Sequence, residues 1–428
     1  MRKMTAALGL IAASAAHGEN RIDVVRPDAP ALAAYGDHRI GVTTMTFTNP
    51  GQIDVARTGD TGEPPVYDRA LTVEIWYPAT DDTTPGGTYD TILRDGVTPA
   101  TLTGQAARDA VPNTGQNYPL VIISHGYPGN RHLLSPLAEN IASKGYVVAS
   151  IDHPDSTYDD QTAFGSTLVN RPWDQRFVID SMGALDGDLG GIIEADNVAI
   201  IGYSMGGYGA LIYAGAGVTR LSTTYEWGAP QGLLERNMKN TDTHMALMDD
   251  PRVKAFVAFA PWGNNTGFWD AEGLACIEKP LMLIAGGVDD VSSYDALRGI
   301  FDGTVSTTRH LLTFDNANHN AGAPMPPPAE SYAYSEKLGY APFDHYADPV
   351  WDSVRMNNIS QHFVTAYLDL HLKGDTAKAA YFDLVPVAQD GVWSVDEAEK
   401  PTEEHSYWVG FPNRTAAGLR FETKPAGE

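Results

Sequence analysis

Cysteine is nearly absent from this chain of 428 residues, which contains only Cys276. A single cysteine excludes an internal disulfide, so the fold must be held together by its core. Cys276 has no neighbouring histidine and no sharp turn around it, so we expect a small buried hydrophobic side chain and not a nucleophile. With 43% hydrophobic residues, the chain is long enough to bury a large core.

Basic residues are scarce as well: 29 lysines and arginines stand against 54 aspartates and glutamates, for a net charge of −25. Such a surface repels nucleic acid and anionic membranes, so we expect neither as a partner. A solubilising surface is the simplest interpretation of the acidity, and attraction of a substrate is the alternative.

Long hydrophobic runs are also missing, since the apolar segment near the N-terminus is too short to span a bilayer. Met1–Met4 is short and basic, Thr5–Ala16 is small and apolar, and Ala13–Ala15 supplies a small-x-small cleavage pattern. This order is typical of a secretory signal peptide, so we expect residues 1–16 to direct export to the periplasm or the medium. Cys276 lies far from the cleavage site, so we expect no stable membrane anchor.

Apolar patterning predicts the fold class. Two alternating runs, Arg39–Phe47 and Ala70–Tyr77, predict an antiparallel start to a sheet. Beyond Pro119, continuous apolar runs, typical of strands covered on both faces, alternate with helical stretches. This rhythm predicts an α/β fold with a mostly parallel sheet of the eight-stranded type and helices on both faces. The expected strands are Leu120–Ser124, Tyr146–Ile151, Val198–Gly202, Val253–Ala260, Leu281–Ala285 and His310–Phe314; the expected helices are Leu133–Lys144, Trp173–Leu185, Met205–Ala214, Tyr294–Phe301 and Trp351–Leu372.

The remaining stretches do not follow this rhythm. Residues 49–65 are rich in glycine, aspartate and proline and predict a loop. Residues 219–250 and 321–349 are long and polar or proline-rich, so we expect two loop insertions over the active edge of the sheet. We find no linker and no internal repeat, and therefore expect residues 17–428 to form a single domain with a C-terminal extension at 374–428.

The segment Val198–Gly209 carries the strongest chemical signal. It follows a strand with Gly202-Tyr203-Ser204-Met205-Gly206 and then a helix, which is the G-x-S-x-G nucleophile elbow found in α/β-hydrolases. A serine on such a strained turn leaves no room for a side chain two residues to either side, hence the glycines. We therefore expect Ser204 to be a nucleophile, with a structural turn as the alternative.

A serine nucleophile needs a base, which in this fold follows the acid along the chain. His319 lies just after the last predicted strand, at the edge where open α/β sheets bind ligands. It is the expected base, with His345 in the second long loop as the alternative. The other rivals fall within a predicted strand or helix: His310, His362 and His371.

Two adjacent carboxylates follow the strand Leu281–Ala285. Asp289 is the expected acid and Asp290 the alternative, the role being to orient the imidazole and stabilise its protonated form. The backbone N–H groups of Tyr127, after the first parallel strand, and of Met205, after the nucleophile, are the expected oxyanion donors. His125 more often braces such a loop than takes part in catalysis.

A second group of polar residues lies near Asp152 and could suggest a metal site. Without a recognisable ligand spacing we expect a solvated loop, with a calcium site as the alternative, and we expect no metal and no cofactor. The group comprises Asp152, His153, Asp155, Asp159 and Asp160.

The chain resembles bacterial relatives of platelet-activating factor acetylhydrolase, which are also described as predicted dienelactone hydrolases. The likeness covers about Arg39–Lys373 and includes His125-Gly126, Arg131, Leu137–Ala149 and Asp152-His153. It implies a triad of Ser204, Asp289 and His319 with oxyanion donors at Tyr127 and Met205. Dienelactone hydrolases proper use a cysteine nucleophile where this chain has Ser204, so the substrate of that label does not carry over.

A narrower likeness is to cutinase-like polyester hydrolases. It includes Ala260-Pro261-Trp262 and Asn265–Phe268 beside the elbow and Gly126-Tyr127. This resemblance implies that Tyr127 and Trp262 bind the acyl part of the substrate as an aromatic clamp, with ordinary core packing of Trp262 as the alternative. Those enzymes are more compact and lack counterparts of residues 219–250 and 321–349, and loops over the site favour discrete molecules.

These observations predict a serine ester hydrolase that acts through an acyl-enzyme on small to medium acyl or lipid-like esters. The expected partner is a small-molecule ester. Cleavage of polyesters or aromatic diesters is the alternative within this class. A catalytically inactive exported binding protein is the alternative from another class, and it would predict a broken triad, whereas every member is present in order.

Overall fold

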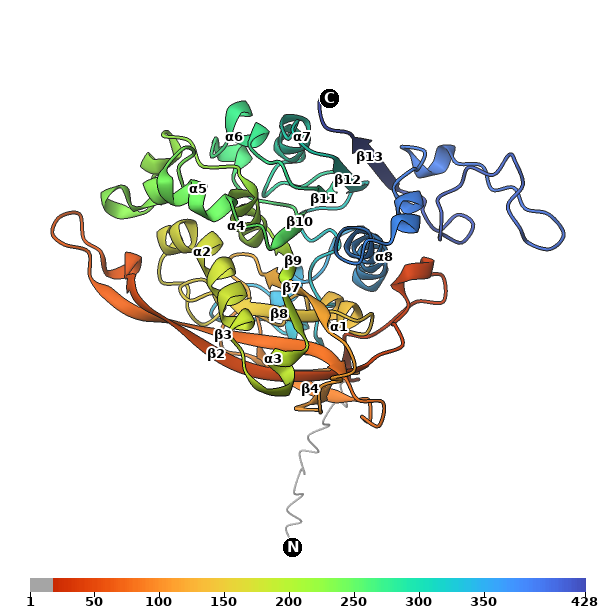
Figure 1. The fold of residues 1–428 in the computed structure, drawn as a ribbon, viewed down its shortest axis with the longest axis horizontal. Helices are drawn as coiled ribbons and strands as arrows, with labels where there is room; N and C mark the ends of the chain where they lie inside the picture. Colours follow the sequence, from red (N-terminus) through yellow and green to blue (C-terminus); the bar gives the residue numbers. More distant parts are fainter. Residues whose placement is uncertain (1–17) are drawn as a thin grey trace, which may run out of the picture.

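The computed structural model describes residues 18–428, and the expected signal peptide lies outside them. One large sheet crosses the molecule, and the chain runs back and forth across it from the N-terminal hairpin to a C-terminal edge strand (Figure 1). Among the described residues, no helix is long and apolar enough to cross a membrane.

The large sheet has ten strands in the order β13-β12-β11-β10-β9-β7-β8-β3-β2-β6. All eight expected strands form, the six from β7 to β12 run parallel, and β6 and β13 extend the two edges. β3 pairs antiparallel with both β2 and β8, as the alternating N-terminal runs predict. The bounds are β2 Arg39–Ile53, β3 Val66–Ala79, β6 Ala107–Arg108, β7 Tyr118–Ser124, β8 Val147–Asp152, β9 Ile193–Tyr203, β10 Val253–Phe259, β11 Leu281–Gly286, β12 Arg309–Phe314 and β13 Leu419–Lys424.

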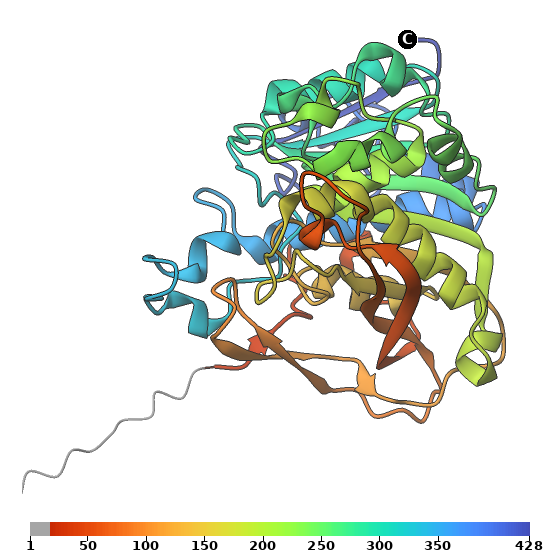
Figure 2. The same cartoon turned by 90° about the vertical axis from the view of Figure 1, so that its left-hand side faces the viewer.

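A second, three-stranded sheet was not expected from the sequence. It has the order β1-β5-β4, with β1 at Asn20–Arg21, β4 at Gly87–Ile92 and β5 at Pro99–Gly104. The light blue segment 321–349 lies beside this sheet (Figure 2), and the Ser335 hydroxyl donates a hydrogen bond to Asp95 in the β4–β5 turn at 3.0 Å. The three-stranded sheet therefore supports the segment 321–349.

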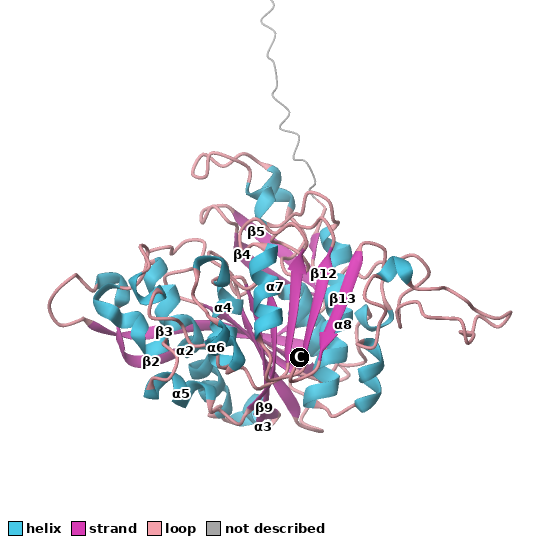
Figure 3. Cartoon of the chain, turned by 90° about the horizontal axis from the view of Figure 1, so that it is seen from above, coloured by secondary structure: helices cyan, strands magenta, loops and turns pink. Residues whose placement is uncertain are grey.

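Helices cover both faces of the large sheet (Figure 3). Alternate residues of β7 belong to two separate cores, one on each face of the sheet. Val121 and Ile123 belong to the core that includes α1 and α8, whereas Leu120 and Ile122 belong to the core that includes α2, α4 and α7. Burial on both faces is why the strand is apolar throughout. The helices are α1 Ser135–Ala142, α2 Phe164–Gly183, α3 Gly187–Gly191, α4 Met205–Ala214, α5 Asp242–Met248, α6 Ala271–Ala275, α7 Tyr294–Gly303 and α8 Ser353–Leu372.

Several boundaries differ from expectation. The β2–β3 hairpin extends into the predicted loop 49–65, leaving only residues 54–65 between its strands. Helix α2 begins at Phe164 instead of Trp173 and continues through Pro172, because buried packing of its first turns outweighs the local cost of proline. Cys276 is only partly buried, so the expected fully buried position was wrong; it follows α6 where the chain turns at the surface.

The two expected insertions are folded segments and not plain loops. Residues 219–250 contain α5 and the short 3₁₀ helices Ser222–Thr224 and Pro230–Asn237. Residues 321–349 contain the 3₁₀ helices Ala329–Tyr332 and Pro342–His345. The chain beyond α8 runs outward before returning to the sheet as β13 (Figure 1). That residues 17–428 form one domain stays a prediction.

Removing the Phe421 ring should show how strongly β13 anchors the C-terminal region. The ring is 2% exposed and stacks on Phe363, with ring centroids 5.0 Å apart. We expect Phe421→Ala to lower the free energy of unfolding by about 3–5 kcal/mol, because it leaves a cavity between β13 and α8. Val392→Ala, at a side chain that is 49% exposed, should change it by less than about 0.5 kcal/mol. Denaturant unfolding of both variants tests this, and equal losses would contradict it.

Candidate active site

Ser204 lies on a tight turn between β9 and α4. Its φ of +52° is unusual for a residue with a side chain, and the strain is held by close backbone contacts on both sides. A Cβ built on Gly202 would lie 2.2 Å from the Gly206 carbonyl oxygen, and one on Gly206 would lie 1.9 Å from the Ser124 carbonyl oxygen. The two glycines are therefore required by space, as the sequence argument expected.

His319 and Asp289 come together from the loops after β12 and β11. The imidazole Nδ1 lies 2.9 Å from one oxygen of the Asp289 carboxylate. The other carboxylate oxygen accepts hydrogen bonds from the backbone N–H groups of Val291 and Ser292, at 2.9 and 2.8 Å. Asp290 is exposed and contacts the same loop only through its backbone N–H. The geometry thus favours Asp289 over Asp290 as the partner of His319.

Ser204 and His319 line one cavity of about 640 Å³ at the edge of the sheet. Asp289 is buried behind the imidazole, whose side chain is 13% exposed. The rival His345 lines the same cavity, but its Nε2 contacts the Tyr158 hydroxyl at 2.9 Å and not a carboxylate. Burial and nearby positive charge lower the pKa of His345 to about 3, so it stays neutral near pH 7.

The two expected oxyanion donors belong to peptide units that are fixed at their carbonyl ends. The Gly126 carbonyl, which shares a peptide with the Tyr127 N–H, accepts from His125 Nδ1 at 2.7 Å. The Ser204 carbonyl, which shares a peptide with the Met205 N–H, accepts from the backbone N–H groups of Tyr208 and Trp262 at 2.9 and 3.2 Å. In a trans peptide the N–H points away from the C=O, so these bonds set the direction of both donors.

Both N–H groups are free to donate a hydrogen bond to an anion. Within residues 18–428 neither the Tyr127 nor the Met205 N–H donates a hydrogen bond to another group of the chain. The tautomer of His125 is also defined, because its Nε2 accepts the His153 N–H at 3.2 Å and its Nδ1 must then carry the proton. Burial lowers the pKa of His125 far below its ordinary value, which keeps this neutral form.

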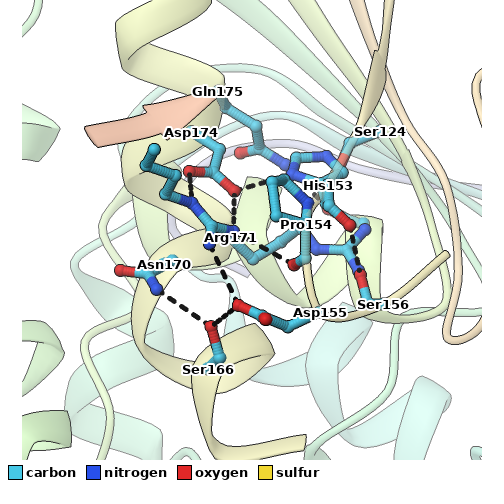
Figure 4. Close-up of polar contacts among 12 residues, drawn as sticks. Ser124, His153, Pro154, Asp155, Ser156, Ser166, Asn170, Arg171, Asp174 and Gln175 are labelled. Carbon is cyan, nitrogen blue, oxygen red and sulfur yellow. Dashed lines mark hydrogen bonds and ion pairs between the residues drawn. The ribbon is translucent and has the colours of Figure 1, made fainter. Parts of the chain in front are cut away.

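A buried polar network supports the oxyanion loop from behind (Figure 4). The Arg171 guanidinium donates to the His125 carbonyl and, at 2.7 Å, to the Ser156 hydroxyl. Burial lowers the pKa of Arg171 to about 9, which still leaves it charged near pH 7. Gln175, one helical turn further along α2, donates to the Gly206 carbonyl at 3.1 Å. Helix α2 therefore holds the oxyanion loop and the nucleophile turn together.

The same network contains a second serine–histidine–aspartate set, which the sequence analysis did not find. His153 lies 2.9 Å from both the Ser124 hydroxyl and the Asp174 carboxylate. Asp174 also receives two hydrogen bonds from Arg69, at 2.8 and 2.9 Å. Ser124, His153 and Asp174 are at most 2% exposed, so no substrate reaches Ser124 and the set is structural.

The expected solvated loop around Asp152 is therefore wrong for most of its residues. Burial alone would raise the pKa of Asp174, but Arg69 and its hydrogen bonds hold it well below the ordinary value. Burial lowers the pKa of His153 to about 3. Asp152 forms an ion pair with Arg131, and Asp155 lies 3.1 Å from Arg69. These carboxylates pair with the buried Arg69 and the partly buried Arg131 from other segments, a pairing that adjacent residues in the sequence do not reveal.

The two residues of the expected aromatic clamp do not line the same cavity. Tyr127 lines the cavity with Ser204, whereas Trp262 is not among its lining residues. The ring of Phe164 lies between them, with its centroid 5.1 Å from that of Tyr127 and 5.4 Å from that of Trp262. Trp262 also contacts Phe268 at 5.2 Å between ring centroids. Its role in substrate binding stays a prediction.

Several known proteins are similar in sequence to parts of this chain. Residues 90–178 match the model of the family described as platelet-activating factor acetylhydrolase, isoform II. Over 212 residues the chain is 26% identical to cutinase est1 of Thermobifida alba, covering 49% of this chain and 56% of the cutinase. It is 34% identical over 212 residues to cutinase 2 of Thermobifida cellulosilytica, covering 49% of this chain and 63% of that enzyme. It is 36% identical over 76 residues to the platelet-activating factor acetylhydrolase of Bos taurus, covering 17% of each chain.

The fold is also similar to a solved structure over nearly its full length. A ferulic acid esterase from Streptomyces cinnamoneus superposes with a TM-score of 0.56 at 18% identity, covering 94% of this chain and 99% of that one. The chain therefore has the α/β-hydrolase fold. The expected fold and the expected resemblance of the chain to acetylhydrolases and cutinases are confirmed. The matched segments span less than two thirds of each curated relative named above.

Substituting the two adjacent carboxylates Asp289 and Asp290 separates their roles. We expect Asp289→Asn to lower kcat at least about 100-fold, because an amide no longer stabilises a protonated imidazole. The matched change Asp290→Asn should lower kcat far less, since that side chain is exposed and does not contact His319. Turnover of p-nitrophenyl acetate by both variants provides the measurement, and the opposite ranking would assign the acid to Asp290.

His125 should act as a positioning residue for the Tyr127 N–H. We expect His125→Ala to lower kcat about 10- to 100-fold with a smaller effect on KM, because a misdirected oxyanion donor weakens the transition state more than the substrate complex. His125→Asn should recover part of this loss, since its amide N–H can reach the Gly126 carbonyl. Steady-state kinetics and thermal unfolding are measured together; equal kcat for both variants despite equal stability would contradict the assignment.

Proposed function

We propose that this protein is a serine hydrolase of carboxylic esters that acts through an acyl-enzyme. The observation that carries the proposal is that Ser204, on its strained turn, and His319, held by Asp289, line the same cavity. Relatives named as cutinases and as platelet-activating factor acetylhydrolases support the same class of reaction. The catalytic roles of Ser204, Asp289 and His319 are part of this proposal.

The arrangement supports a two-step reaction. His319 removes the proton from the Ser204 hydroxyl as its oxygen attacks the ester carbonyl, and Asp289 stabilises the imidazolium that forms. The N–H groups of Tyr127 and Met205 bind the negative oxygen of the tetrahedral intermediate. The alcohol leaves with the proton from His319, and Ser204 remains acylated. A water molecule, deprotonated by His319, then attacks the acyl group, and the acid is released as Ser204 regains its proton.

We assign small to medium acyl esters, including lipid-like ones, as the substrate class. The cavity of about 640 Å³ is bounded by Tyr340, Phe343 and Pro349 of the folded segment 321–349. A folded segment beside the cavity suits a discrete molecule better than a polymer surface. The cutinase relatives favour polyesters or aromatic diesters as the second candidate. Export to the periplasm or the medium also remains part of the proposal, because it rests on residues 1–16.

Removing the Ser204 hydroxyl tests the function directly. We expect Ser204→Ala to abolish turnover of p-nitrophenyl esters from acetate to palmitate and of a soluble aromatic diester, with an unchanged melting temperature. In the unmodified enzyme the rate should fall toward palmitate, in keeping with the proposed class of small to medium acyl esters. Ser222→Ala, at a buried serine in the segment 219–250 that does not line the cavity, is the control and should keep full activity. Turnover by folded Ser204→Ala would refute the nucleophile.

A further inference from the structure

Arg94 is a cationic side chain that the proposed reaction leaves unused. It lies in the turn between β4 and β5 and lines the cavity that contains Ser204 and His319. Among the residues that the structure describes, no other lysine or arginine lines this cavity. Within residues 18–428 its guanidinium forms neither an ion pair nor a side-chain hydrogen bond; only its backbone N–H does, with the Tyr346 hydroxyl at 3.0 Å. A partly buried guanidinium without a partner lacks the charge compensation that such groups usually have.

The turn that carries Arg94 is firmly built. One oxygen of the neighbouring Asp95 accepts the backbone N–H groups of Val97 and Thr98, at 3.1 and 2.9 Å. Its other oxygen accepts the Thr98 hydroxyl at 2.6 Å and the Ser335 hydroxyl at 3.0 Å. Gly96 has a φ of +69°, and a Cβ there would lie 2.1 Å from the Tyr158 carbonyl oxygen. The backbone at Arg94 is thus fixed before any ligand binds.

The carboxylates of the cavity do not neutralise Arg94. The Asp348 carboxylate accepts hydrogen bonds from the backbone N–H groups of Asn318, Val350 and Trp351 at 2.7–2.9 Å. These N–H groups of its own loop stabilise its negative charge. Asp290 and Asp344 are exposed to solvent. None of the three lies within the 4.0 Å that defines an ion pair with Arg94. The nearby His345 adds no competing charge, because burial and the charge of Arg94 keep it neutral near pH 7.

We propose that Arg94 binds an anionic group of the substrate, a carboxylate or a phosphate, so that the preferred substrate is an ester that carries a negative charge. The proposal rests on the proposed ester hydrolysis at Ser204. A guanidinium suits both anions because its N–H groups can donate two parallel hydrogen bonds to paired oxygens. A cation that lines the cavity also offsets the repulsion that a chain with a net charge of −25 exerts on an anion.

The test compares three aryl acetates that differ at one position. They are 4-acetoxybenzoate, 4-acetoxyphenyl phosphate and the neutral methyl 4-acetoxybenzoate, and kcat/KM is measured by pH-stat at low ionic strength. Arg94→Met should lower kcat/KM for at least one anionic ester at least tenfold more than for the methyl ester, mainly through KM. Arg94→Lys should recover part of the loss. The anionic substrate with the larger loss identifies carboxylate or phosphate as the ligand.

Arg57→Met is the matched control, because it removes the same charge from an exposed side chain that does not line the cavity. It should leave all three rates unchanged. If Arg94→Met lowers the rates of charged and neutral esters by the same factor, the proposal is wrong. Losses that Arg57→Met reproduces would also overturn it, since they would reflect net charge alone.

A binding measurement separates this proposal from the proposed function. In Ser204→Ala, calorimetry with 4-acetoxybenzoate and 4-acetoxyphenyl phosphate should show that the added change Arg94→Met weakens binding of the preferred anion at least tenfold. If the unmodified protein hydrolyses no ester but this difference remains, the hydrolase assignment fails and the anion site stands. If hydrolysis depends on Ser204 but neither anion binds through Arg94, the anion site fails and the hydrolase assignment stands.

Discussion

The close approach of three backbone segments at Gly206 is the constraint on which the site depends. Because Gly206 and Gly202 have no side chains, the ends of β7 and β9 lie directly against the start of α4. The loop after β7 brings the Tyr127 N–H to the nucleophile turn, and the turn itself brings the Met205 N–H. A side chain at either glycine would push these segments apart and separate the two donors from Ser204. The spacing of the whole site follows from this contact.

Buried charge keeps that contact in place. Arg69, Asp174 and Arg171 lie behind the oxyanion loop beside the neutral His153, and desolvation makes each of these three charges costly unless it is paired. Arg171 donates to the His125 carbonyl of the loop, and Gln175 of the same helix donates to the Gly206 carbonyl of the nucleophile turn. The network therefore contributes less to net stability than to a fixed geometry, which is what electrostatic stabilisation of an oxyanion requires.

Local patterns in the sequence predicted the eight central strands, the turn at Ser204 and the loops that carry Asp289 and His319. These features depend on neighbours along the chain: apolar runs, glycines two residues from a serine, and polar residues after a strand. Arg94 and the network around Asp174 could not be predicted in this way. Asp174 meets Arg69 across 105 positions, and Arg94 meets Tyr346 across 252. The early start of α2 has the same origin, because its first turns are stabilised by tertiary packing.

The position of the family match follows the same distinction between local sequence patterns and long-range contacts. Residues 90–178 begin in β4 and end in α2, so they include Arg94, the oxyanion loop and most of the buried network, but neither Ser204 nor His319. The likeness to platelet-activating factor acetylhydrolases thus falls on the scaffold that supports the oxyanion loop, while the nucleophile turn is of the kind that the whole fold shares. Chemistry common to many esterases comes from the turn after β9. The segment before it supplies the oxyanion loop, most of the buried network behind that loop, and Arg94, which lines the cavity.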